Sequence, residues 1–231
     1  MSNSMPPHVV NFLAQEGPLR CVAPAVADLV PRLALRQYRR GNILCREDDP
    51  ADIAWIIVSG WIRLYRFTRD GDEKVIGYRG RGQFAGEAAM LDNSRQECVA
   101  EAYTDAQCVV MMRADFYRLL ADHSDFMRET LRMVSADRAR LARDLVDLSI
   151  LDARRRLICT LMTLADRYGT VDAKGTLRLS LPMTQLELAA IIGATRETLS
   201  RLCSGLPEVR IEQKELSITN WAEFQALHPA K

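Results

Sequence analysis

The chain has 231 residues, of which 48% are hydrophobic and 26% are charged, and its formal net charge is +1. This length accommodates two modest domains, and the hydrophobic fraction is ordinary for a protein with a packed core. The near-zero net charge excludes recognition of nucleic acid by bulk electrostatics, so any basic patch must be local. No apolar run approaches the roughly 20 residues that cross a bilayer, and we expect no membrane span.

Cysteine usage and the N-terminus both predict a cytoplasmic protein. The six cysteines are scattered without a CxxC pair: Cys21, Cys45, Cys98, Cys108, Cys159 and Cys203. In a reducing compartment such cysteines are free thiols rather than disulfides. The N-terminus lacks the charged and apolar regions of a secretory signal. No nucleophile–base pair, metal-ligand cluster or Walker-type loop is evident, so we expect neither an enzyme nor a metal site.

Residues 1–27 are expected to be a loose lead-in, because prolines interrupt any long element: Pro6, Pro7, Pro18 and Pro24. From residue 35 to 112, short apolar segments alternate with glycines. Residues 53–58 are typical of a buried strand that ends at a Ser59-Gly60 turn, and Arg69-Asp70-Gly71-Asp72 predicts a hairpin. Regular short strands of this kind favour an all-β sandwich or barrel.

A long helix is predicted over residues 125–149. Its signal is a set of positions spaced alternately by four and three residues: Met127, Leu131, Val134, Arg138, Leu141, Leu145 and Leu148. This spacing predicts a coiled-coil seam, apolar except at Arg138, along a helix about 37 Å long. We expect the seam to dimerise; the alternative is a stripe that packs only on its own β-domain. Arg138 is either a surface side chain lying along the helix or a polar contact for register and ligand.

Residues 184–206 have the pattern of two helices joined by a tight turn. Thr184 and Glu187 form a capping box at the start of the first helix, Gly193 suits its end, and Thr195 can cap the second helix. The expected inner face of the first helix consists of apolar residues at helical spacing: Leu186, Ala189 and Ala190. This pattern is typical of a helix-turn-helix that reads DNA.

The second of these helices separates an apolar side from a polar side. Its apolar side is Leu199, Leu202 and Leu206, and roughly opposite lie Glu197, Ser200, Arg201 and Ser204, with Arg196 at the flank. Arginine presents two donors that match guanine, and glutamate can accept from the amino group of cytosine. The alternative is an ordinary pair of packed helices with a solvated charged face.

Residues 195–201, TRETLSR, resemble the recognition helix of the Crp/Fnr family, which includes the cyclic-AMP receptor protein and the fumarate-and-nitrate-reduction regulator. The resemblance runs from about residue 28 to 220. It implies an α+β fold with an N-terminal cyclic-nucleotide-binding-like β-roll, a long dimerisation helix and a C-terminal winged helix-turn-helix. It also implies that Arg196, Glu197 and Arg201 read the bases of a palindromic, TGTGA-like site. Candidates for phosphate contacts are Thr195, Thr198 and Ser200.

The wing departs from the family, because the usual Gly-Leu-Ile after the recognition helix is missing and residues 207–218 form a shortened wing. The loop 168–175 corresponds to the surface that touches RNA polymerase in the cyclic-AMP receptor protein, although its sequence differs. The run Arg154-Arg155-Arg156 is expected to be a solvated face, with phosphate contact as the alternative.

Phe84-Ala85-Gly86-Glu87 is similar to the start of the family's phosphate-binding cassette. In cyclic-AMP binders an Arg-Ser pair then grips the phosphate, and a Thr-Ser pair on the long helix meets the adenine. Alignment puts Gln96 and Glu97 at the first pair, and Leu141 and Ala142 at the second. A carboxylate repels a phosphate, although Arg95 could take the arginine's place if the loop shifts. We therefore expect no tight binding of cyclic AMP. The effector-pocket candidates are Glu87, Arg95, Gln96, Glu97, Arg138 and Leu141.

The signal that the β-roll senses stays open. An iron–sulfur cluster needs about four cysteine ligands, usually grouped near the N-terminus, where only Cys21 lies, so we do not expect one. Haem needs an axial ligand such as cysteine or histidine, and the histidines are His8, His123 and His228. Cys203 is either a small core residue or, if exposed, a redox switch. A different small molecule, or no effector, completes the alternatives.

The predicted organisation is a lead-in (1–27), a β-roll sensor (28–124), a dimerisation helix (125–151) and a winged helix-turn-helix domain (152–231). The predicted function is a homodimeric, sequence-specific transcription regulator that binds double-stranded DNA and RNA polymerase. The alternative from another class is a β-roll ligand-binding module that regulates a partner protein rather than DNA.

Overall fold

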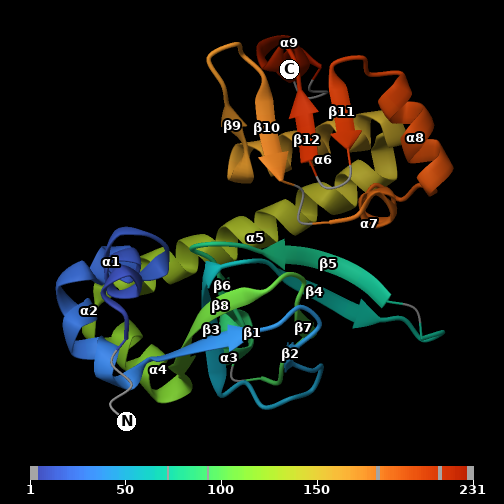
Figure 1. Cartoon of the computed structure of the whole chain (residues 1–231). Coiled ribbons are helices and arrows are strands. Elements are labelled where there is room, and N and C mark those ends of the chain that lie inside the picture. Colours follow the sequence, from blue (N-terminus) through green and yellow to red (C-terminus); the bar gives the residue numbers. More distant parts are fainter. Residues whose placement is uncertain (1–4, 72, 93, 181–182, 213–214, 228–231) are drawn as a thin grey trace. The chain divides into compact units, whose positions relative to one another are not determined.

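The computed structural model describes residues 5–71, 73–92, 94–180, 183–212 and 215–227 (Figure 1). The chain forms two compact units, Met1–Asp137 and Arg138–Lys231. Among the described residues, no helix is both long enough and apolar enough to span a bilayer.

The N-terminal segment is helical and packed. Helix α1 (Pro7–Gln15) is followed by a 3₁₀ turn (Pro18–Val22), α2 (Ala23–Leu29) and a second 3₁₀ turn (Val30–Arg32). Their apolar side chains, such as Phe12 and Leu19, are buried in the core of the first unit. The prediction of a loose lead-in is therefore wrong. The prolines stand in the first turn of each helical segment, where a missing N–H costs nothing.

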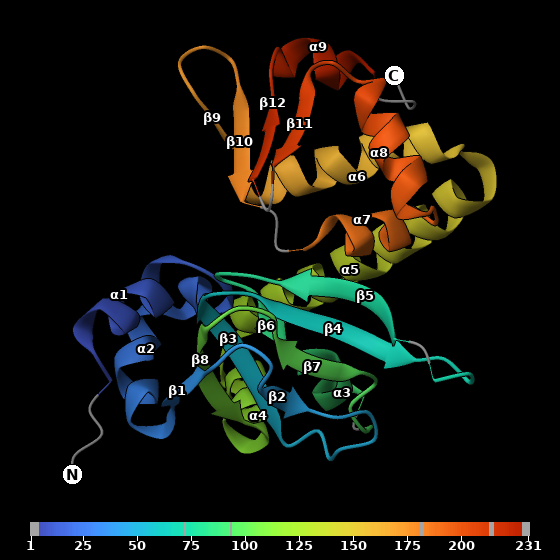
Figure 2. The ribbon, with the colours of Figure 1, turned by 45° about the vertical axis from the view of Figure 1, so that its right-hand side comes forward.

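Two antiparallel four-stranded sheets form the described β-roll (Figures 1 and 2), with strand orders β1-β8-β3-β6 and β2-β7-β4-β5. The strands are β1 (Ala34–Tyr38), β2 (Ile43–Cys45), β3 (Ile53–Ser59), β4 (Ile62–Phe67), β5 (Glu73–Arg79), β6 (Phe84–Ala85), β7 (Val99–Ala102) and β8 (Ala106–Met112). Strand β3 is buried along most of its length, as its sequence predicts.

The predicted turn at Ser59-Gly60 is confirmed, and its glycine is required. Gly60 has a φ of +81°, and a Cβ built there would lie 2.3 Å from the carbonyl oxygen of Asp105. Any side chain at this position would therefore clash with backbone as well as strain its own.

Three helices complete the first unit: α3 (Glu87–Leu91), α4 (Arg113–Asp122) and the N-terminal part of α5 (Ser124–Ile150). Phe84, Phe116 and Phe126 pack edge to face, with ring centroids 5.7 to 6.4 Å apart. These rings come from β6, α4 and α5, so they hold the start of the long helix against the strand that leads into the cassette.

The second unit is a winged helix-turn-helix. It contains α6 (Ala153–Tyr168), β9 (Thr170–Val171), β10 (Leu177–Ser180), α7 (Gln185–Ile191), α8 (Arg196–Ser204), β11 (Val209–Glu212), β12 (Glu215–Ile218) and α9 (Trp221–Ala226). Its described strands form one antiparallel sheet in the order β11-β12-β10-β9, with β11 and β12 as the wing. Asp152 caps α6 by accepting a hydrogen bond from the backbone N–H of Arg155 at 2.9 Å. The α+β fold class predicted from the sequence is confirmed.

Candidate nucleic-acid interface and effector site

Side-chain caps set the turn between α7 and α8. The Thr184 hydroxyl accepts from the N–H of Glu187 at 3.2 Å, and the Glu187 carboxylate accepts from the N–H of Thr184 at 2.8 Å. Gly193, with a φ of +63°, ends the first helix, and the Thr195 hydroxyl caps the second by accepting from the N–H of Thr198 at 3.2 Å. The predicted capping box, glycine end and second cap are all confirmed.

The inner face of α7 differs from the predicted one. Leu188 and Ala189 are buried, together with Ile192 just after the helix. Leu186 is 64% exposed and Ala190 is also exposed. The prediction was wrong for Leu186 and Ala190. The buried face consists instead of Leu188, Ala189 and Ile192, which lie one and four residues apart along the chain. Leu186 is therefore an apolar side chain on the outer surface of the unit.

Helix α8 presents a polar face to solvent. Leu199 and Leu206 are buried and Leu202 is half-buried, whereas Arg196, Glu197, Ser200, Arg201 and Ser204 are exposed. Hydrogen bonds from its own backbone N–H and from Thr195, together with the Arg196 guanidinium, lower the pKa of Glu197. Glu197 is therefore an ionised acceptor near neutral pH, which suits the amino group of cytosine.

The three predicted phosphate-contact residues lie at the N-cap and in the first two turns of α8. Thr195 and Ser200 are exposed and Thr198 is half-buried. The Thr195 hydroxyl donates to the Thr198 hydroxyl at 3.1 Å while it caps the helix. This pairing fixes where the hydroxyl groups lie at the helix N-terminus, where backbone N–H groups already favour an anion.

Arg156 has a structural use that its sequence did not reveal. Its guanidinium donates from Nε to the carbonyl oxygen of Ile192 at 2.7 Å and from Nη1 to that of Leu151. Arg156 thus braces α6 against the end of α7, and is committed to backbone rather than to a phosphate. Arg154 and Arg155 are exposed, as predicted for a solvated face.

The loop 168–175 contains strand β9 and the tight turn of the β9–β10 hairpin. The Asp172 carboxylate accepts from the backbone N–H groups of Lys174 at 2.9 Å and Thr176 at 3.1 Å. These bonds, with Arg178, lower the pKa of Asp172. The hydrogen bonds to Asp172 therefore fix the backbone conformation of this turn, which lies at the surface. The tip of the wing, at 213–214, lies outside the described residues.

In the first unit, the cassette begins at a buried carboxylate. Gly86 has a φ of +85°, and α3 starts at Glu87, whose side chain is buried. Burial raises the pKa of Glu87, and the nearby Arg79 guanidinium opposes this effect. Arg79 was missed by the sequence reasoning, because its contact with the cassette depends on how β5 and β6 come together.

The positions that replace the phosphate-gripping pair do not form an anion site. The Arg95 guanidinium is exposed and donates to the carbonyl oxygen of Asp48 at 2.8 Å, so it has not moved into the missing arginine's place. Glu97 is exposed, and Gln96 is buried with no hydrogen-bond partner for its Nε2. A cyclic phosphate would meet a carboxylate and an amide here instead of a guanidinium and a hydroxyl.

Helix α5 carries the predicted seam on an exposed side. Met127, Leu131, Leu141 and Leu145 are exposed and Val134 is half-buried, whereas Phe126 and Thr130 are buried against the β-roll. Leu131 is 57% exposed in the single chain. The side chain of Leu148 lies outside the described residues. Arg138 and Leu141, the last two effector-pocket candidates, are exposed and belong to the second unit.

Burial lowers the reactivity expected of three cysteines: Cys45, Cys108 and Cys203. Burial raises the pKa of Cys203, which is half-buried on α8, and raises the pKa values of Cys45 and Cys108 to about 12. A raised thiol pKa lowers the population of thiolate, the form that oxidants attack. The half-buried Cys203 therefore has a smaller thiolate population than an ordinary exposed cysteine.

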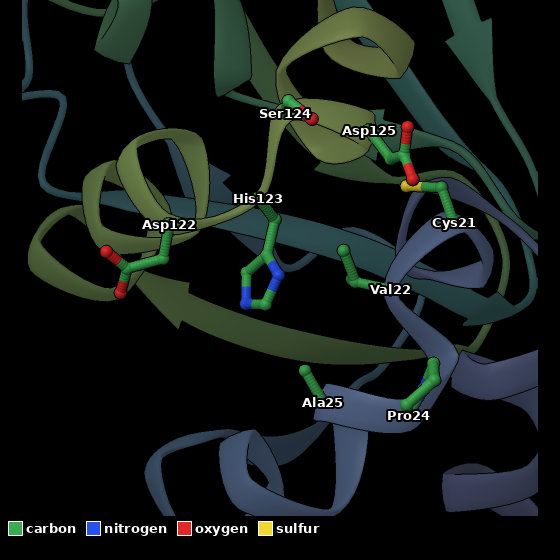
Figure 3. A pocket seen from close by; sticks show the side chains of 8 residues that line it. All are labelled: Cys21, Val22, Pro24, Ala25, Asp122, His123, Ser124 and Asp125. Carbon is green, nitrogen blue, oxygen red and sulfur yellow. The ribbon is translucent and has the colours of Figure 1, made fainter.

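One cavity of about 290 Å³ lies between the N-terminal helices and the α4–α5 junction (Figure 3). His123 points into it. Burial raises the pKa of Cys21, and the negative charges of Glu129 and Asp125 add to this effect. Within the described part of the chain, no group of three or more cysteine, histidine or acidic side chains could hold a metal ion. His8 is exposed, and His228 lies outside the described residues.

Comparison with known proteins matches both halves of the chain. Residues 35–123 match a cyclic nucleotide-binding domain, and residues 139–227 match a Crp-like helix-turn-helix domain. A "CRP-like cAMP-activated global transcriptional regulator" of Mycobacterium tuberculosis is 30% identical over 213 residues, which cover 90% of this chain and 95% of that protein. A "Cyclic AMP receptor protein" of Thermus thermophilus is also 30% identical, over 81% of this chain and 83% of its own length.

Among solved structures, FixK2 from Bradyrhizobium japonicum superposes with a TM-score of 0.74 at 20% identity, covering 86% of this chain and 98% of its own. That likeness supports the fold alone. The M. tuberculosis match instead covers 90% of the chain, and so extends through the sensor, the long helix and the helix-turn-helix unit, which we call the reader. The chain belongs to the Crp/Fnr family of bacterial transcription regulators, which bind DNA through a helix-turn-helix.

Proposed function

We propose that the protein is a cytoplasmic, homodimeric regulator that reads a palindromic, TGTGA-like site in double-stranded DNA and contacts RNA polymerase. The observation that carries the proposal is the polar face of α8, where Arg196, Glu197 and Arg201 are exposed together on a helix whose N-terminus is capped by Thr195. Residues near the start of a recognition helix are those that reach base edges in the major groove. The β9–β10 hairpin is the candidate polymerase contact.

The reading chemistry follows from the donors and acceptors on this face. Arg196 and Arg201 each present a planar fork that matches the O6 and N7 atoms of guanine. Glu197, ionised near neutral pH, accepts from the amino group of a cytosine. Thr195, Thr198 and Ser200 position the helix on phosphates without carrying sequence information.

Replacement of Arg201 by alanine tests the base-reading assignment. Arg201→Ala should weaken binding to the preferred site by about 1–3 kcal/mol and relax specificity at one base pair. Fluorescence anisotropy against a set of duplexes, each with one substituted position, measures both effects. Arg118→Ala, at an exposed position on α4 in the first unit, is the matched control. An equal loss on every duplex would contradict base reading by Arg201.

The seam on α5 supports a dimer. Four apolar side chains of the predicted seam are exposed in the single chain, and an apolar stripe at this spacing is typical of a helix that pairs with another helix. A two-fold dimer presents its recognition helices about 34 Å apart, one turn of DNA, which requires a palindromic site.

The effector is the part of the proposal that departs from the relatives. The M. tuberculosis protein is named for activation by cyclic AMP, but here Gln96 and Glu97 stand where a phosphate-gripping pair would be needed. We assign the sensor to another signal: haem with a histidine or cysteine ligand, a different small molecule, or none.

Titration calorimetry with cyclic AMP tests this departure. The purified protein should give no binding heat at concentrations up to about 100 μM ligand, because Glu97 would repel the phosphate. The double variant Gln96→Arg/Glu97→Ser, which restores the phosphate-gripping pair, is the control and should gain measurable affinity. Micromolar binding by the unmodified protein would overturn the assignment.

A further inference from the structure

One partly buried arginine joins three elements of the sensor. The Arg79 side chain, at the end of β5, is 13% exposed. Its Nε donates to the carbonyl oxygen of Phe84 on β6 at 3.1 Å, and its Nη2 donates to the Asp137 carboxylate on α5 at 2.8 Å. Nη1 makes a longer contact, 3.4 Å, with the carbonyl oxygen of Tyr78. A single guanidinium therefore links β5, the strand that opens the cassette, and the long helix.

The groups around Arg79 are mainly carboxyl groups, which its positive charge stabilises in their ionised form. Burial raises the pKa of the Glu87 carboxyl; the Arg79 guanidinium opposes this effect, whereas the carboxylates of Asp137 and Glu97 add to it. The guanidinium also opposes the rise that burial causes in the pKa of the Cys98 thiol. Backbone carbonyl groups also accept hydrogen bonds from Nε and Nη1 of Arg79, and such additional bonds offset part of the cost of burying an ion pair. An incoming phosphate would find the guanidinium already occupied and three carboxyl groups near it.

Asp137 lies on α5 where this helix passes from the first unit into the second. It is the last residue of the first unit, and α5 continues from Arg138 into the second unit as one helix. The ion pair therefore ties the cassette to the helix that carries the proposed seam and leads to the reader.

We propose that the Arg79–Asp137 ion pair takes the place of an effector: it couples the cassette to α5 within the protein itself, and so supports DNA binding without a small molecule. This inference rests on the proposed DNA-binding function. The physical reason is preorganisation, since a helix already fixed on its sensor loses less conformational entropy when the protein binds DNA. Arg79 acts as a positioning residue and touches neither DNA nor a ligand.

The test compares Asp137→Asn, Arg79→Gln and the double variant, with no small molecule added. Asparagine keeps the size of Asp137 and removes its charge. Each single variant should bind the palindromic duplex about tenfold more weakly, which corresponds to about 1.4 kcal/mol. The double variant should lose no more affinity for the duplex than the single variant that binds it more weakly, because both changes break the same contact. Arg132→Gln is the control, since it breaks the exposed Arg132–Glu129 pair within α5 and should leave affinity within about twofold.

Hydrogen exchange of the free protein separates this inference from the proposed function. In Asp137→Asn, amides of α5 near residue 137 and of β5 should exchange faster, while α7 and α8 should be unchanged. If unmodified protein binds no DNA, the proposed function fails, and the exchange result alone still decides whether the pair couples these elements. Unchanged exchange in Asp137→Asn, or affinity that is unchanged or increased, would overturn the inference.

Discussion

Leu131→Glu is expected to dissociate the proposed dimer, raising its dissociation constant by at least about 100-fold, or about 2.7 kcal/mol. Leu131 is 57% exposed in the single chain and lies in the seam of α5. In a two-fold dimer the substitution would bring two carboxylates into one apolar seam, where each is desolvated without a partner and repels the other. Sedimentation velocity over a range of protein concentrations measures the change.

The same variant should bind a palindromic duplex far more weakly, because each monomer then engages only one half-site. Ala136→Glu is the matched control: it adds the same charge on an exposed α5 position away from the seam, and should stay dimeric. If Leu131→Glu sediments like the unmodified protein, this seam is not the dimer interface. If Ala136→Glu dissociates as well, charge on α5 rather than the seam is responsible.

Leu199→Ala is expected to destabilise the second unit, which contains the helix-turn-helix, and to leave the stability of the first unit unchanged. Leu199 is 1% exposed and anchors α8 in the core of the second unit. Truncation of such a leucine costs about 2–5 kcal/mol through lost burial and the cavity that remains. The two compact units should therefore unfold separately in calorimetry, with only the transition of the second unit shifted to lower temperature.

The neighbouring change Ser200→Ala is the control for Leu199→Ala, because Ser200 is exposed and its loss should leave both transitions in place. A single transition that shifts as a whole in Leu199→Ala would show that the units unfold as one. An unchanged transition would show that Leu199 is not part of the core of the reader.

Features with a local cause were predictable from the sequence. The capping box of Thr184 and Glu187, the cap at Thr195 and the positive φ of Gly193 each depend on residues within one turn of a helix. The buried strand β3 and the turn at Gly60 follow in the same way from short patterns. The base-reading, phosphate-contact and seam assignments remain predictions, because they concern a partner that the single chain does not contain.

Features that depend on distant residues were missed or predicted wrongly. The prolines of the first 27 residues suggested a loose segment, because the same residue that interrupts a helix also starts one. Leu186 was placed inside because its spacing fits a helical face, but the core contacts of α7 select Leu188 instead. Arg79 and Arg156 pair with groups 58 and 36 residues away along the chain, and no local pattern reports such contacts.

The most direct measurement of the central claim is the anisotropy of a labelled duplex that carries an inverted repeat of a TGTGA-like half-site, titrated with unmodified protein. A duplex with both half-sites scrambled is the comparison. The account predicts two chains per duplex, affinity for the repeat on the order of 10³-fold tighter than for the scrambled duplex, and steep weakening between about 50 and 200 mM salt. Equal affinity for the two duplexes, or no dependence on salt, would contradict it.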